Sequence, residues 1–223
     1  MRLKSFSHWM PASDIRVKWI RRCAPGRSFV DVGSLWKVHG FFSFLAEMAG
    51  AKRVISVDIA PVTKEFKEMK KRLLSSVQFV QGDIHDHRTL EKVGRCDVVF
   101  CSGVLYHSPH PAYFLSRLRS MCGKTLILQT RVIQEVRGAR NMAVFYPYLN
   151  ASQRKLWKVG RGRQNTITTP YRPTWGYGNC FWGFSPSWVE SMLQWAGFRV
   201  AERLLRFPVA TYLCETKDFP PCG

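Results

Sequence analysis

The sequence lacks several features, each of which would have pointed to a particular class of protein. Its 7 cysteines include no Cys-x-x-Cys pair, which argues against a zinc module, and we predict no metal site. No apolar run reaches the roughly eighteen residues of a membrane span, and residues 1–30 hold no run of signal-peptide length. We therefore expect a soluble protein in a reduced, cytoplasmic setting, with most cysteines serving as small core residues.

Acidic residues are also scarce. The chain has 34 Lys and Arg against 15 Asp and Glu, a formal net charge of +19. The excess is regional, since residues 131–180 carry nine basic residues and one acid, Glu135. Such a field attracts phosphates, nucleic acid or other anions, although a merely solvated basic surface is the plainer alternative. Oligomeric state cannot be predicted from this pattern.

Hydrophobic periodicity predicts an α/β fold. Short apolar strands are expected at 28–32, 53–58, 76–83, 96–103 and 124–130, with helices between them at 40–50, 62–74, 87–94 and 111–121. Five strands separated by helices favour a parallel sheet with right-handed crossovers. A helix near 14–22 precedes them, and a helix at 185–198 with two closing strands follows.

Informative residues follow the predicted strands, because ligands bind at the carboxyl ends of parallel strands. The first strand leads into Asp31-Val-Gly33 and the second ends in Asp58, a carboxylate suited to two ribose hydroxyls. The third ends in Gly82-Asp83-Ile84, which suits the edge and face of an adenine. The fourth leads into Ser102-Gly103-Val-Leu-Tyr106-His107.

The segments DVG, VISVDIA, VQGDIHD and CSGVLYHSPHP occur in the order and spacing found in class I S-adenosylmethionine-dependent methyltransferases, which residues 27–130 resemble. The resemblance implies a Rossmann-like three-layer sandwich, a seven-stranded sheet of order 3-2-1-4-5-7-6 and S-adenosyl-L-methionine as cofactor. It implies a helical segment at 1–27, a cofactor-binding core at 28–130, a lid inserted at 131–180, and a closing helix and hairpin at 181–223. The implied cofactor contacts are Asp31, Gly33, Ser34, Asp58, Ile59, Gly82, Asp83, Ile84, Ser102 and Gly103.

One stretch departs from the family pattern. The usual Asp-x-Gly-x-Gly-x-Gly loop is replaced by Asp31-Val-Gly33 followed by SLWKVH, and the next glycine is Gly40. We interpret this as a cofactor loop with an insert, which leaves open whether Trp36 covers the cofactor or packs outside. A nicotinamide enzyme is the competing interpretation, but G-x-G-x-x-G is absent.

Tyr106 and His107 are the predicted catalytic residues, because the fourth strand directs them toward the reacting centre. Their segment VLYH resembles the Val-Leu-Tyr-His of enzymes that modify the wobble uridine of transfer RNA. Methyl transfer can depend largely on orientation, and a base is needed only when the acceptor must lose a proton. The alternative is that His107 caps a helix or packs beneath the cofactor.

Aromatic and basic residues alternate in the predicted lid, a combination used for flat or anionic substrates. The predicted substrate contacts are Arg131, Tyr146, Arg172 and Trp182. These features predict methyl transfer to an O or N atom of a small, anionic molecule such as a natural product, sugar or nucleotide-linked glycan. An RNA (tRNA) methyltransferase is the first alternative. A non-catalytic binding protein with this fold is the second.

Overall fold

A computed structural model describes residues 11–147, 149–157 and 180–217. The helices are α1 (Ile15–Cys23), α2 (Phe41–Met48), α3 (Lys64–Leu73), α4 (His87–Val93), α5 (Pro111–Met121), α6 (Ala151–Leu156) and α7 (Pro186–Trp195), with a short 3₁₀ helix, η2 (Leu105–His107). The strands are β1 (Ser28–Val32), β2 (Arg53–Asp58), β3 (Gln78–Gln81), β4 (Cys96–Ser102), β5 (Cys122–Arg131), β6 (Ala143–Tyr146), β7 (Phe181–Phe184), β8 (Phe198–Arg206) and β9 (Val209–Thr216).

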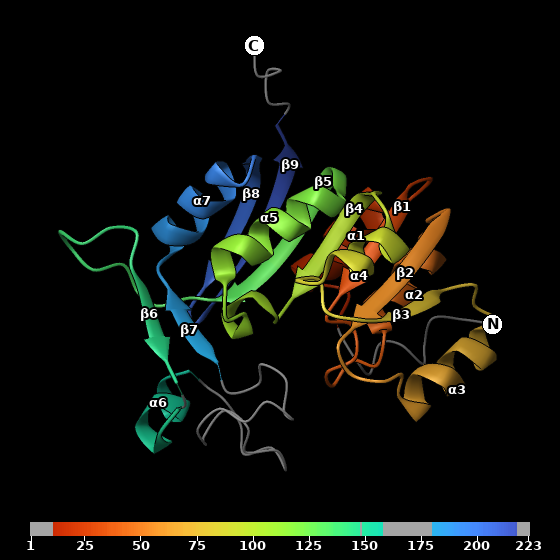
Figure 1. The fold of residues 1–223 in the computed structure, drawn as a ribbon, viewed down its shortest axis with the longest axis horizontal. Coiled ribbons are helices and arrows are strands. Elements are labelled where there is room, and N and C mark those ends of the chain that lie inside the picture. The colour runs from red at the N-terminus through yellow and green to blue at the C-terminus, as the bar shows by residue number, and fades with distance from the viewer. Residues whose placement is uncertain (1–10, 148, 158–179, 218–223) are drawn as a thin grey trace.

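Seven strands form the main sheet in the order β3-β2-β1-β4-β5-β9-β8 (Figure 1). Strands β1 to β5 are parallel, and β9 runs antiparallel to both β5 and β8. Because β8 and β9 are the sixth and seventh strands of this sheet, the predicted order 3-2-1-4-5-7-6 is confirmed. Their turn contains Pro208, as predicted.

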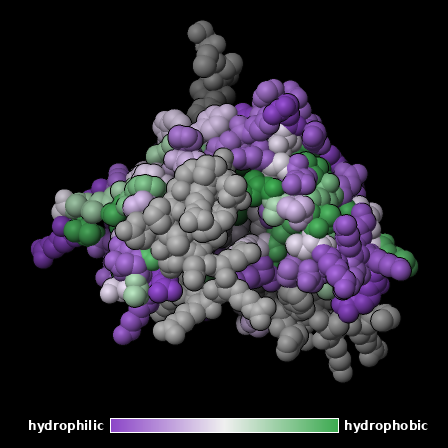
Figure 2. Space-filling model, turned by 60° about the horizontal axis from the view of Figure 1, so that its bottom comes forward, coloured by the Kyte–Doolittle hydropathy of each residue, from purple (hydrophilic) through white to green (hydrophobic). Residues whose placement is uncertain are grey.

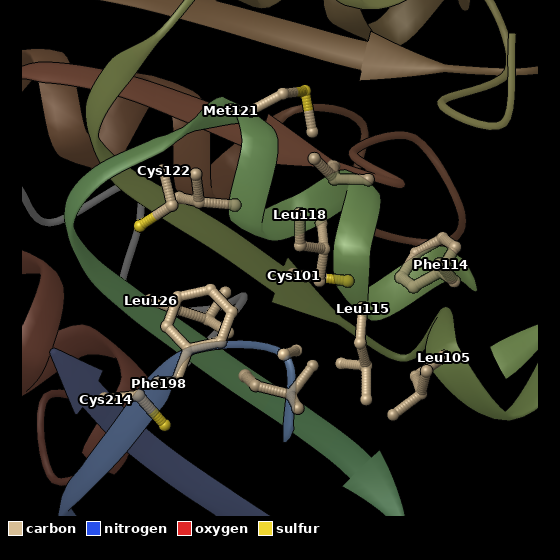
Figure 3. Packing of buried hydrophobic residues seen from close by; sticks show 14 of the residues in the cluster. Cys101, Leu105, Phe114, Leu115, Leu118, Met121, Cys122, Leu126, Phe198 and Cys214 are labelled. Atoms are coloured by element: carbon tan, nitrogen blue, oxygen red, sulfur yellow. The ribbon is translucent and has the colours of Figure 1, made fainter. Parts of the chain in front are cut away.

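Alternation along the parallel strands sends apolar side chains to both faces of the sheet. On one face, Val30 and Val99 pack with α5 and α7. Figure 3 shows part of this cluster, where Leu115 and Leu118 of α5 lie against Leu126 of β5. The other face buries residues of α1 and α2 against the strands. The result is the three-layer sandwich that the sequence predicted.

Two local differences from the sequence-based expectations have simple physical causes. The helical spacing of residues 62–74 predicts Leu74 on the apolar face of that helix. In the structure Leu74 is the left-handed C-cap of α3 and is 93% exposed. The glycine and aromatic content of residues 175–184 predicts a loop. Residues 181–184 instead form strand β7, which pairs with β6 in a separate two-stranded sheet because residues 143–146 supply a partner strand distant in sequence.

All six cysteines in the described residues are buried, in line with the expected core role. Within the same residues, no helix has both the length and the apolar character that crossing a membrane would require.

Candidate functional site at the carboxyl edge of the sheet

The loops that follow β1 to β5 meet at one edge of the sheet, at the bottom of Figure 1. The strand registers bring their ends together: Val32 is level with Val57 and Cys101, and Ser102 is level with Gln129. Seen toward this edge, the surface that the described residues form is mostly hydrophilic, with separate apolar patches (Figure 2). Most of the predicted site residues lie along this edge.

The turn after β1 requires a glycine. Gly33 has a φ of 75°, and a Cβ there would lie 2.1 Å from Cγ2 of Val104, in the loop after β4. A side chain is excluded both by the left-handed backbone and by this close approach. The loops after β1 and β4 therefore lie closer together than they could with any other residue at position 33.

Asp58 at the end of β2 has a carboxylate that joins two loops. Its Oδ2 accepts a hydrogen bond from the backbone N–H of Leu35 at 2.8 Å, and its Oδ1 accepts one from Ala60 at 2.9 Å. Burial raises the pKa of Asp58, while these backbone hydrogen bonds act to lower it. An ionised carboxylate is purely an acceptor, so this orientation suits a ligand that offers hydroxyl donors.

Asp31 and Ser34 lie beneath the loop instead of on its surface. Asp31 is 1% exposed, and its Oδ2 accepts a hydrogen bond from Ser43 of α2 at 2.8 Å. Burial is the main cause that raises the pKa of Asp31 to about 7. The Ser34 hydroxyl accepts a hydrogen bond from Ser56 at 2.6 Å. Both side chains hold the loop from below, and their direct contact with a cofactor stays a prediction.

The insert after Ser34 turns outward toward α3. Leu35 is buried, whereas Trp36 is 62% exposed. His39 lies 3.1 Å from the hydroxyl of Thr63, the N-cap of α3, through its Nδ1. Lys37 and His39 both have positive φ angles, which give the insert its tight path. Both placements of Trp36 stay predictions, because an exposed indole fits either one.

The segment after β3 holds the residues predicted for the adenine. A Cβ on Gly82 would lie 2.3 Å from Oγ1 of Thr89 in α4, so close packing requires this glycine. Asp83 Oδ1 lies 2.7 Å from Nδ1 of His85. Ile59 is 46% exposed at the edge, whereas Ile84 is buried in the core. An adenine contact by Ile84 therefore has less support than one by Ile59.

An arginine from α1 reaches the end of β4. Arg16 donates from one guanidinium nitrogen to Ser102 Oγ at 3.1 Å and to Gln129 Oε1 at 3.0 Å. The guanidinium also forms an ion pair with Asp14 and lies over the ring of Phe42. Gly103 follows Ser102 with a φ of 81°, and a Cβ there would meet only the Tyr106 hydroxyl, at 3.7 Å. The backbone is therefore open to close approach at this position.

Tyr106, His107 and Arg131 come together where β4 and β5 end. The His107 ring lies 2.8 Å from the carbonyl of Cys180 through Nδ1, so Nδ1 donates and Nε2 is left to accept a proton. Burial lowers the pKa of His107 to about 4, and the nearby positive charge of Arg131 contributes in the same direction. Burial raises the pKa of Tyr106, whose hydroxyl is also hydrogen-bonded by Arg131.

Residues of the predicted lid and of β7 pack against this cluster. Arg131 donates to the carbonyl of Trp157, which is fully buried between Tyr146 and Phe181. Trp182 of β7 donates from its indole N–H to the carbonyl of Ser108 at 3.0 Å. Tyr146 and Tyr106 thus pack on the same ring, that of Phe181, while Trp182 binds the residue that follows His107. Arg172 lies outside the described residues.

Sequence reasoning missed Arg16 and His85. Arg16 stands in a basic helix, IRVKWIRRC, in which nothing separates it from the exposed arginines beside it. His85 lies in a predicted loop, and its contact with Ser108 joins residues 23 positions apart. A signal existed only for His85, which closely follows the Gly-Asp pair at the end of a strand.

Comparison with known proteins agrees with this geometry. Residues 30–124 match the family model described as "Methyltransferase domain". The tRNA U34 carboxymethyltransferase of Alteromonas mediterranea is 29% identical over 159 residues, which are 63% of this chain and 44% of that protein. The chain thus spans less than half the length of this curated relative.

Solved structures show the same fold at low sequence identity. The N-terminal domain of EvdMO1, solved with SAH bound, superposes with a TM-score of 0.61 at 16% identity over 92% of this chain and 82% of that one. An O-methyltransferase family protein from Burkholderia thailandensis superposes with a TM-score of 0.60 at 15% identity, over 90% of this chain and 55% of that one.

The parallel sheet and the acid-and-glycine loops at its carboxyl edge define an α/β domain of the type that binds nucleotide-like cofactors. Within that class, residues 30–124, which are less than half of the chain, match a methyltransferase domain. This match agrees with the family that the sequence motifs indicate. The open backbone at Gly103 and the acceptor carboxylates of Asp58 and Asp83 fit the cofactor of this class.

Proposed function

We propose that the chain catalyses methyl transfer from S-adenosyl-L-methionine to an oxygen or nitrogen atom of a small anionic molecule. The observation that carries this proposal is the cluster of Arg131, Tyr106 and His107 beside the predicted cofactor edge. When bound, the cofactor supplies a methyl group on a positively charged sulfur.

The residues of the site have separate roles in binding the two substrates and in moving the proton. Asp58 accepts hydrogen bonds from the ribose hydroxyls, and Asp83 accepts one from the adenine. Arg131 binds a phosphate or carboxylate of the acceptor, for which a guanidinium is well suited. His107, held in one tautomer by the Cys180 carbonyl, takes the proton of the acceptor at Nε2. The aromatic residues of the lid exclude water from this position.

Calorimetric titration with S-adenosylmethionine and S-adenosylhomocysteine tests the cofactor half of this proposal. We expect micromolar binding by the natural chain and at least a tenfold weaker affinity for Asp58→Ala, which loses a charge-assisted acceptor. Glu91→Ala is the matched control, because it removes one exposed carboxylate from α4. If the folded natural chain bound neither ligand, the enzymatic proposal would fail and a non-catalytic role would be favoured.

An RNA acceptor is the second candidate function, and two observations favour it. The chain is 29% identical over 159 residues to a protein named tRNA U34 carboxymethyltransferase, and its net charge is +19. Binding to tRNA should then weaken steeply with salt, because phosphate contacts release counterions. A fluorescence titration at several salt concentrations measures this slope. Weak binding with a flat slope would leave the small anionic acceptor as the better proposal.

A further inference from the structure

His85 connects the loop after β3 with the loop after β4. Its Nδ1 lies 2.7 Å from Oδ1 of Asp83, and its Nε2 lies 3.0 Å from Oγ of Ser108. The imidazole is largely buried, with its side chain 15% exposed. It packs on Tyr113 and Phe114 of α5, with ring centroids 5.9 Å and 5.6 Å away. The ring is therefore fixed by contacts on several sides.

The hydrogen bonds around His85 run in one direction. A carboxylate can only accept, so Nδ1 carries the proton and donates to Asp83. Nε2 then accepts from the hydroxyl of Ser108, and that oxygen accepts from the backbone N–H of His110 at 3.2 Å. Asp83 Oδ1 also accepts the backbone N–H of His85 at 2.9 Å. Two donors from one residue thus hold the same oxygen of the Asp83 carboxylate.

Ser108 extends this chain of contacts to β7. It is 2% exposed, and its carbonyl accepts the indole N–H of Trp182 in β7. Its own N–H donates to Leu105 of η2, the turn that also contains Tyr106 and His107. His85 is therefore tied at one end to the acid of the adenine site and at the other to the turn of the predicted catalytic residues.

We propose that His85 is a positioning residue that makes the site select adenine. By engaging Oδ1, it presents the other carboxylate oxygen of Asp83 to the 6-amino group of the purine. A 6-oxo purine would direct a carbonyl oxygen at this fixed acceptor, leaving two acceptors facing each other. A site built to receive a donor rejects an analogue that lacks it. This inference rests on the proposed function.

The test compares the affinities of S-adenosylhomocysteine and its 6-oxo analogue, S-inosylhomocysteine, by calorimetry. We expect the natural chain to prefer the adenine form by roughly tenfold to a hundredfold. His85→Asn places an amide N–H near the position of Nδ1 and should keep most of that preference. His85→Gln places its amide near Nε2, keeps the Ser108 contact, and should reduce the preference about tenfold.

Asp83→Asn tests whether His85 affects the adenine preference through the Asp83 side chain. Its amide can donate to a 6-oxo group, so the preference should shift toward the inosine form if selection acts through this side chain. The ratio of two affinities is insensitive to a general loss of folded protein, and thermal unfolding of each variant checks that it folds.

Two negative results are distinguishable. If the natural chain prefers the adenine form and His85→Gln keeps the same ratio, His85 is merely structural and this inference is wrong while the proposed function stands. If the natural chain binds neither ligand, the proposed function fails, and the inference fails with it.

Discussion

The two halves of the carboxyl edge satisfy their polar groups in different ways. In the cofactor half, formed by the loops after β1 to β3, carboxylates are held by nearby backbone and side-chain donors, as Asp58 is by Leu35 and Ala60. In the acceptor half, formed by η2, the end of β5, β7 and the described part of the predicted lid, many contacts are aromatic and join distant segments. His107, for example, is fixed by Cys180, 73 residues away.

This difference indicates which contacts determine the specificity of each half. The cofactor half is built from the turns that follow three neighbouring strands, so its residues can be recognised from short motifs at the strand ends. The acceptor half depends on β7 and on Trp157 for the positions of Arg131 and His107. We therefore expect substitutions in the first half to abolish cofactor binding, and substitutions in the second to change the acceptor while cofactor binding is retained.

The largest effect is expected for Gly33→Ala. The added Cβ would overlap the Val104 side chain at 2.1 Å and would force an alanine into a left-handed backbone. Cofactor affinity should fall by at least a hundredfold, because the loops after β1 and β4 must separate. Gly138→Ala is the control, since that glycine also has a positive φ but has nothing within 4 Å of its Cβ position. Calorimetry with S-adenosylhomocysteine measures both, and equal losses would contradict this explanation.

Arg131→Ala tests the acceptor half. It removes the guanidinium proposed to bind the anion of the acceptor, so anion binding should fall by roughly ten- to a hundredfold. The shift in unfolding temperature caused by inorganic phosphate, with S-adenosylhomocysteine present, measures this loss. Arg131→Lys should retain part of the shift because it keeps the charge. Weakened binding of S-adenosylhomocysteine itself would contradict the division into two halves.

The third prediction concerns Asp31 and pH. Its folded pKa of about 7 lies above its ordinary value of 3.8, so the folded state binds a proton more readily than the unfolded chain. Asp31 therefore makes stability fall as pH rises from about 4 to about 7, at up to about 1.4 kcal/mol per pH unit. Asp31→Asn should remove this slope. Urea unfolding at pH 5 and pH 8 measures it, and an unchanged slope would show that Asp31 is ionised in the fold.

His107 should show the opposite dependence. Its folded pKa of about 4 lies below the ordinary 6.5, so the unfolded chain takes up its proton first, and stability falls as pH decreases through this range. An NMR titration should find the ring neutral down to about pH 4. His87→Gln, at an exposed histidine of α4, helps to assign the resonances. A midpoint near 6.5 would mean that the ring is not desolvated in solution.

Trp36→Ala is expected to have the smallest effect. The side chain is 62% exposed, so its removal should leave both stability and cofactor affinity within about 0.5 kcal/mol of the natural chain. Leu35→Ala provides the contrast, because that neighbour is buried and should cost about 2 to 5 kcal/mol. Thermal unfolding and calorimetry check both. A large loss of cofactor affinity in Trp36→Ala would place the insert over the cofactor.

Much of the fold was predictable because periodicity reports burial directly. Strands β1 and β2 and the helix α2 between them agree with the periodicity, and the order of the main sheet agrees with the family resemblance. Leu74 was assigned to the wrong environment because an apolar residue at the end of a helix can also be its left-handed cap. The strand β7 was missed because its partner β6 lies 35 or more residues earlier in the chain.

By itself, the sequence determined the layers of the sandwich and the residues that stand at the ends of the parallel strands. Those features follow from local spacing, since burial repeats along each element and parallel strands share one functional edge. Only the tertiary structure decided which side chains support one another, such as His85 between Asp83 and Ser108, or Arg16 beside Ser102. Such contacts depend on distances between separate segments, and no local pattern in the chain records them.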